Sequence, residues 1–141
     1  MPVAAQPHRQ PRVIIPRPDR VRSLTGASFA WLDTRLARDH WLSAMSPQAI
    51  ATYTFLCLAA NPQGMSWYRR DKIRAAVDLG EDELADSLTA LCHLDLIAYQ
   101  PFHQNASEGF RQVLALPHGG PPLPRRSIQL EALIDSIGTR T

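Results

Sequence analysis

The sequence contains few cysteines, few glycines and no long apolar run. Among its 141 residues, only 2 are cysteine and 7 are glycine. Cys57 and Cys92 form no CxxC pair, which argues against a zinc knuckle or a dithiol redox motif. Both stand among apolar residues, so we expect them to be buried free thiols in a cytoplasmic protein. No apolar run reaches the roughly 18 residues of a membrane span, and the Arg- and Pro-rich start does not resemble a secretory signal.

The motifs of catalysis are also missing. The sequence has no glycine-rich phosphate loop, no GxSxG elbow and no pair of carboxylates placed to form a pocket. His40 and His93 are lone histidines without ligand spacing, so we expect no metal site and no other cofactor. The acids at 81–83 follow one another at a helix end, so their side chains diverge. These absences indicate a protein that is not an enzyme.

Proline divides the chain into three parts. Hydrophobic residues make up 45% and charged residues 20%, which is ordinary for a folded domain, and the length suffices for one core. Of the 12 prolines, five fall within 2–18 and four within 117–124. Because proline removes a backbone donor and fixes φ, neither helix nor central strand is expected in the first segment. We expect a flexible basic arm over 1–25, a folded domain over 26–118, and a Pro/Gly linker with a C-terminal amphipathic helix over 119–141.

Charge follows the same division. The net charge of +2 combines +4 on residues 1–25, −3 on residues 26–119 and +1 on residues 120–141. The basic character therefore lies on the arm, and the folded middle is mildly acidic.

Helical and strand patterns alternate in the folded part. Ser46-Pro47 is a strong helix start, because serine caps the first turn and proline suits its first position. The helix that follows is apolar nearly all round, through Phe55 and Leu58 among others, which predicts a central helix. The expected elements are an extended segment over 28–32, a helix over 34–45 capped by Asp33 and bent near His40, helices over 47–60, 70–78 and 81–94, and strands over 65–68, 97–102 and 110–116. The buried side of the helix over 34–45 is expected to hold Leu36, Trp41, Leu42 and Met45.

This order of elements predicts a winged helix-turn-helix, a mainly α fold with a small β-hairpin as its wing. The chain resembles winged-helix domains in the isoleucine of helix 2, the leucine before the turn, the leucine-rich helix 3 and the start of the wing. The matching residues are Ile73, Leu79, Leu88, Leu91, Leu96 and Ile97. The chain departs from the family's usual residues at Arg74, at Asp78 in the turn and at Gly80 in the cap of helix 3. These departures concern DNA reading more than folding.

The upstream part narrows the resemblance. An aromatic-rich extended segment, a short helix and a Ser-x-x-Ala start of a tyrosine-bearing helix resemble the N-terminal domains of plasmid and phage replication initiators and replisome organisers. The matching residues are Trp31, Leu32, Leu36, Met45, Ser46, Ala49, Tyr53 and Leu56. The resemblance covers about residues 28–116. It implies DNA binding by a protein of a bacterium, a phage or a mobile element.

We expect a non-catalytic factor that binds double-stranded DNA in replication, transposition or transcription. In such folds helix 3 enters the major groove, which would turn Ser87, Ala90 and His93 toward the bases. Its acidic N-terminus disfavours phosphates, so affinity should come mainly from other segments. The expected backbone contacts are Arg69, Arg70, Lys72 and Arg74 on helix 2, His103, Gln104, Asn105 and Arg111 on the wing, and Arg9, Arg12, Arg17, Arg20 and Arg22 on the arm.

The alternative is a protein-interaction module whose acidic helix 3 binds a basic partner. In that case 69–74 would be a solvated face paired with Asp71 and Asp78, and the arm a disordered tail. Phe29 and Trp31 offer one apolar contact surface, and the tryptophans at 31, 41 and 67 are expected to be core or dimer anchors. A second contact surface is the apolar stripe of the C-terminal helix: Leu130, Leu133, Ile134 and Ile137. This stripe must pack on its own domain, on a second copy or on a larger replication or transposition protein; we expect a homodimer and no membrane partner.

Overall fold

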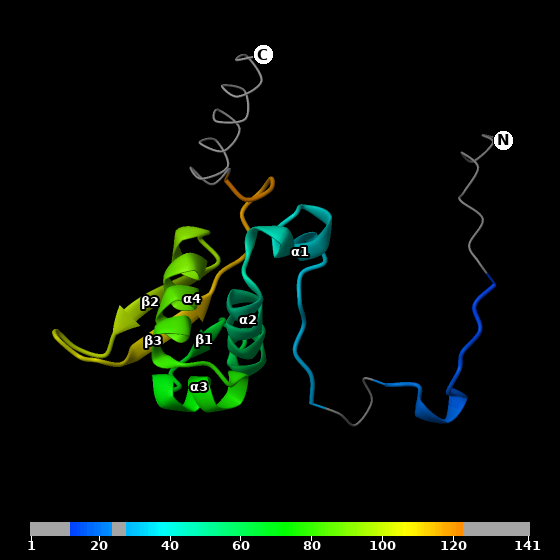
Figure 1. The fold of residues 1–141 in the computed structure, drawn as a ribbon, viewed down its shortest axis with the longest axis horizontal. Helices are drawn as coiled ribbons and strands as arrows, with labels where there is room; N and C mark the ends of the chain where they lie inside the picture. The colour runs from blue at the N-terminus through cyan, green and yellow to red at the C-terminus, as the bar shows by residue number, and fades with distance from the viewer. Residues whose placement is uncertain (1–11, 24–27, 123–141) are drawn as a thin grey trace, which may run out of the picture.

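The computed structural model of the protein describes residues 12–23 and 28–122 (Figure 1). The order of elements from residue 47 onward is the predicted one, so the expected α+β class with a winged-helix-like order is confirmed. The predicted stripe of 130–137, and Arg9 of the arm, lie outside the described residues. The elements are a 3-10 helix η1 (Pro18–Arg20), α1 (Arg35–Arg38), a second 3-10 helix η2 (Leu42–Ala44), α2 (Pro47–Ala59), β1 (Met65–Ser66), α3 (Arg70–Val77), α4 (Glu81–His93), β2 (Ile97–Pro101) and β3 (Gly109–Val113).

The 3-10 helix η1 corrects the expectation that the arm contains no helix. Proline at its first position presets φ for one turn. Arg17 then closes the turn by donating to both carboxylate oxygens of Asp19, at 3.0 and 2.8 Å.

The first helical segment breaks where the sequence predicts. Asp33 Oδ1 accepts from Arg35 N at 2.9 Å and starts α1. His40 has a φ of 66°, which ends the helix and turns the chain into η2. Trp41 is completely buried after this turn, whereas Leu42 is 38% exposed. The expectation that Leu42 is buried is wrong, because the break at His40 rotates the next turn outward.

The long helix α2 packs on α3, α4, β1 and β3, which confirms the predicted central position, although one of its apolar side chains is exposed. Ser46 Oγ accepts from Ala49 N at 3.1 Å, which confirms the predicted cap. Tyr53 and Leu56 are buried, but Leu58 is 65% exposed. Although α2 carries apolar residues on all of its faces, the face with Leu58 is exposed to solvent.

The turn between α3 and α4 accommodates both unusual residues of the sequence. Asp78 adopts the left-handed conformation (φ 56°) that is commonly given to glycine, and aspartate tolerates it better than most residues. Gly80 offers no side-chain cap, but Glu83 Oε1 reaches back to accept from Gly80 N at 3.0 Å. The departures from the family pattern leave the helix-turn-helix intact.

The three strands form an antiparallel sheet in the order β1-β3-β2. Residue 66 pairs with 111, and 99 pairs with 111 on the other side. One sheet face packs on α4 through Ile97, while the opposite face carries Phe110 and Gln112. Figure 1 shows the β2–β3 hairpin extending from the helices as the wing.

The core joins the helices to the inner face of the sheet. Every helix from α1 to α4 contributes to it, so the upstream segment and the helix-turn-helix share one core. No helix within residues 12–23 and 28–122 is long and apolar enough to cross a membrane. The buried apolar residues are Leu36, Trp41, Met45, Ala49, Tyr53, Leu56, Ile73, Leu84, Leu91, Leu96, Ile97 and Leu116.

A matched pair of glycines tests the contact that closes the sheet. Gly64 and Gly119 have φ values of 85° and 79°, so alanine at either position costs about 1 kcal/mol in backbone strain. A Cβ at Gly64 would also lie 2.4 Å from the Val113 carbonyl oxygen, whereas one at Gly119 meets nothing. We expect Gly64→Ala to lower the free energy of unfolding by at least about 3 kcal/mol, as measured by urea denaturation. Equal losses for Gly64→Ala and Gly119→Ala would contradict this.

Candidate nucleic-acid interface

A groove of about 340 Å³ runs between α4 and the hairpin. We call it the wing groove. The pairing of residue 99 with 111 puts both side chains on the sheet face that looks toward α4. Two arginines and one histidine line the groove and no carboxylate is among the lining residues, although Glu108 beside Arg70 also attracts Arg111. The lining residues are Arg70, Ala85, Leu88, Thr89, Cys92, His93, Tyr99 and Arg111.

Arg111 is the most unusual of these residues. It is only 5% exposed, and its guanidinium lies over the Tyr99 ring, 5.0 Å from the centroid. Nη1 donates to the Tyr68 carbonyl at 3.3 Å, and no ion pair holds the group within the described residues. Burial lowers the pKa of Arg111, but a guanidinium stays charged at neutral pH.

The other guanidinium nitrogens of Arg111 have no partner among the described residues. Among the described residues, the only fully buried side-chain polar atom without a partner is Nε1 of Trp41. Nε and Nη2 of Arg111 donate no hydrogen bond within the described residues, so both must keep contact with solvent. The predicted wing cation is therefore a nearly buried charge that lines a cavity, with two nitrogens that have no hydrogen-bond partner among the described residues.

The cations of α3 are partly neutralised. Arg70 Nε lies 3.7 Å from Glu81 and 3.8 Å from Glu108, and Arg70 N also faces both carboxylate oxygens of Glu108 at 3.3 Å. Arg74 lies 3.3 Å from Glu81. Sequence reasoning missed Glu108, because a residue 38 positions away gives no local signal for this contact.

The remaining α3 positions differ in how open they are. Arg69 pairs with Asp71 at 3.5 Å, as the alternative interpretation of this segment supposed. Asp78, the other supposed partner, instead forms the turn. Lys72 is exposed and forms no ion pair within the part of the chain that the structure describes.

Helix α4 presents fewer base-reading side chains than the sequence suggests. Ser87 is 3% exposed, and its Oγ donates to the Glu83 carbonyl at 2.8 Å. The expectation that Ser87 faces a base is therefore wrong, since it faces the core. Ala90 is half-buried and His93 is exposed at the rim of the wing groove. The exposed acids at 81–83 occupy the end of the helix that would lead into a DNA groove.

The predicted wing-tip and arm residues are exposed but lie far apart. His103, Gln104 and Asn105 sit in the hairpin loop, where Asn105 takes a positive φ of 64°. The described arm cations are Arg12, Arg17, Arg20 and Arg22. In Figure 1 the arm lies beyond α1 and α2, on the side opposite the hairpin, so the structure does not bring these two sets together.

Three aromatic rings form a row on the outer face of the sheet. Phe110 meets Phe102 with ring centroids 4.9 Å apart and Trp67 with centroids 6.2 Å apart, both edge to face. Trp67 is 56% exposed, so it is no core anchor. Sequence reasoning missed this outer aromatic row, although the alternation of 65 with 67 and of 110 with 112 carries the signal.

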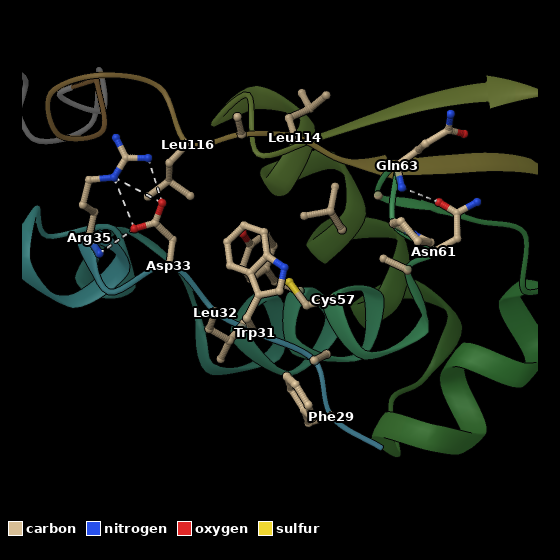
Figure 2. Close-up of a pocket in the computed structure, with 17 residues that line it drawn as sticks. Phe29, Trp31, Leu32, Asp33, Arg35, Cys57, Asn61, Gln63, Leu114 and Leu116 are labelled. Atoms are coloured by element: carbon tan, nitrogen blue, oxygen red, sulfur yellow. Dashed lines mark hydrogen bonds and ion pairs between the residues drawn. The ribbon is translucent and has the colours of Figure 1, made fainter. Parts of the chain in front are cut away.

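Phe29 and Trp31 line a second, larger cavity of about 630 Å³, the upstream groove (Figure 2). Its walls are segment 29–33, the C-terminal half of α2, the loop 61–64 and the chain from the end of β3 to Leu116. Both aromatic side chains remain largely exposed, at 63% and 77%.

Neither thiol is fully buried, so the prediction that both are buried is wrong. Cys92 is exposed at the wing groove, and Cys57 is half-buried at the upstream groove. Cys92 lies at the C-terminal end of α4 and is exposed, whereas Leu84 and Leu91 of the same helix are buried. Within residues 12–23 and 28–122, no group of three or more His, Cys, Asp or Glu side chains is placed to hold a metal.

Thiol labelling tests this difference. Burial raises the pKa of both thiols, so both should react slowly at neutral pH and faster as the pH rises toward 9. Because Cys92 is the more accessible, we expect a thiol reagent to modify it roughly tenfold faster than Cys57. Mass spectrometry of partly labelled protein measures the order, with Cys92→Ser as the control that should remove the fast phase. Faster labelling of Cys57 would contradict the exposure seen here.

No protein-family model, curated protein or solved structure matches this chain.

Proposed function

We propose that this protein is a non-catalytic DNA-binding factor that holds a backbone phosphate of duplex DNA in the wing groove. The observation that carries the proposal is Arg111, a nearly buried guanidinium with free donors and no carboxylate within salt-bridge distance. A phosphate oxygen would satisfy those donors and compensate the charge. The winged-helix-like order supports this role, because it sets a helix and a hairpin side by side, as duplex-binding domains do.

The proposed binding mode relies on the backbone more than on base reading. Arg111 and His93 would contact one phosphate, and Lys72 and the wing tip would contact its neighbours. The acids at 81–83 keep the start of α4 away from the DNA backbone. With Ser87 buried, Ala90 and His93 remain as the α4 residues nearest to bases.

The resemblance to replication initiators supports the biological setting that we propose. An accessory or regulatory role in replication, transposition or transcription suits a small domain whose basic arm adds affinity. The homodimer, the larger protein partner and the cytoplasmic location remain predictions, because no contact in the described residues tests them.

The exchange of Arg111 for methionine tests the proposal without removing the fold. Replacing a desolvated charge by an apolar side chain of similar length should change the free energy of unfolding by no more than about 1 kcal/mol. We expect Arg111→Met to weaken duplex binding about tenfold at roughly 100 mM salt, and to lower the salt slope by about 1. Fluorescence anisotropy with a labelled duplex measures both.

Arg38→Met is the matched control. It removes the same charge from the exposed end of α1, far from the hairpin in Figure 1, so affinity should stay within about twofold. Equal losses for both variants would show that only net charge matters. Failure of the native chain to bind any duplex at roughly 50 mM salt would rule out the DNA proposal.

The arm generates a separate expectation. Substitution of Arg12, Arg17, Arg20 and Arg22 by alanine should weaken duplex binding and lower the salt slope by about 3, since Arg17 already pairs with Asp19. A salt titration of this variant beside the native chain measures the change. An unchanged slope would show that the arm makes no phosphate contact.

A protein-interaction module is the second candidate function, favoured by the outer aromatic row. Exposed aromatic clusters mark partner surfaces, because water does not compensate for their apolar area. The acids at 81–83 would add charge complementarity to a basic partner. In this case Phe110→Ser would abolish partner capture, while Arg111→Met would leave it intact.

A further inference from the structure

The upstream groove is open on one side and apolar on most of its walls. Trp31, Phe29 and Leu32 form one wall and are 77%, 63% and 51% exposed. Cys57 of α2 forms the floor, and Leu114 and Leu116 form the opposite wall (Figure 2). Tyr53 of α2 also lines the groove. Exposed apolar area of this extent is costly in water, so a covering segment would stabilise it.

The described chain ends close to this groove. Residues 114–116 line it, and the chain then passes α1, where a Cβ at Gly120 would lie 2.9 Å from the Asp39 carbonyl oxygen. Asp39 follows Arg35, another lining residue, by about one helical turn of 5.4 Å. The chain that continues beyond Pro122 therefore starts near α1, whose Arg35 lines the groove.

The sequence beyond Pro122 carries the complementary surface. Residues 123–141 contain an apolar stripe at one-face helical spacing, and Glu131 and Asp135 fall outside it. Five residues, 123–127, separate the described Pro122 from Ile128, and this stretch can span up to about 20 Å when extended. The linker is therefore long enough to return the stripe to the groove. The stripe residues are Leu130, Leu133, Ile134 and Ile137.

We propose that segment 128–137 docks in the upstream groove of its own chain through this stripe. A short tether gives the segment an effective concentration in the millimolar range. A second copy at micromolar concentration competes poorly against such a tethered segment, so the same chain is the favoured source. Docking would bury Trp31 and Phe29 and would remove the apolar stripe from water.

Cross-linking to a native thiol tests the docking. Cys57 lies in the groove floor, and Cys92→Ser removes the other native thiol. Single cysteines are placed on the stripe at Leu130, Leu133 or Ile137 of the full chain. The matched control is Ala132→Cys, which points to the other side of a helix. A short bismaleimide reagent joins thiols that lie close together, and gels with peptide mass spectrometry identify the product.

We expect at least one stripe cysteine to cross-link to Cys57 within the monomer about tenfold faster than the Ala132→Cys control. Rates equal to the control at all three stripe positions would overturn the proposal. Cross-linking only between two chains would also overturn it, because a second copy would then be the occupant.

Quenching of tryptophan fluorescence provides a measurement that does not depend on register. In a Trp67→Phe background, acrylamide reports Trp31, because Trp41 is fully buried. Leu133→Asp should raise the quenching constant about twofold, whereas Ala132→Asp should not. Equal quenching in both variants would overturn the docking.

Discussion

The structure depends on a very short pairing of strands, the two residues of β1 against β3. Met65 and Ser66 pair with Gln112 and Arg111, which follow them by more than forty positions. Closing such a long loop costs conformational entropy, and contacts on either side reinforce the pair. The Gly64 carbonyl accepts from Val113 N at 2.8 Å. This register also determines where Arg111 lies, between Ser66 on one strand and Tyr99 on the other.

The acidic partners of Arg70 have two opposing effects: they link α3 to its neighbours, and they reduce the positive charge of α3. Glu108 in the hairpin loop and Glu81 at the start of α4 both face Arg70, and so tie the hairpin and α4 to α3. These partly exposed pairs add little stability individually. They also remove positive charge from the helix that would lie along a DNA backbone. Under the proposed function, DNA binding by the folded domain would therefore depend on Arg111, which has no acidic partner within salt-bridge distance, and on cations outside the core.

Two apolar surfaces remain outside the single core of the domain. The outer aromatic row lies on the wing, on the sheet face away from α4, and the upstream groove lies beside α2 and segment 29–33. They occupy different parts of the molecule and differ in shape, since one is an exposed row and the other a cavity. A row suits a flat partner, whereas a cavity suits the side chains of a narrow segment. The proposed phosphate site in the wing groove shares no lining residue with the upstream groove.

The amino-acid sequence by itself determined the order of elements and most of their ends. Local signals sufficed for this, such as the Ser46 cap, the break near His40 and the leucine stripe of α4, because caps and periodicity act within a few residues. Only the tertiary structure decided which side of each element is buried and which charges meet. It turned Ser87 inward and Leu58 outward, and it brought Glu108 to Arg70. Burial and ion pairing depend on contacts between residues far apart in the chain, and no local pattern encodes those contacts.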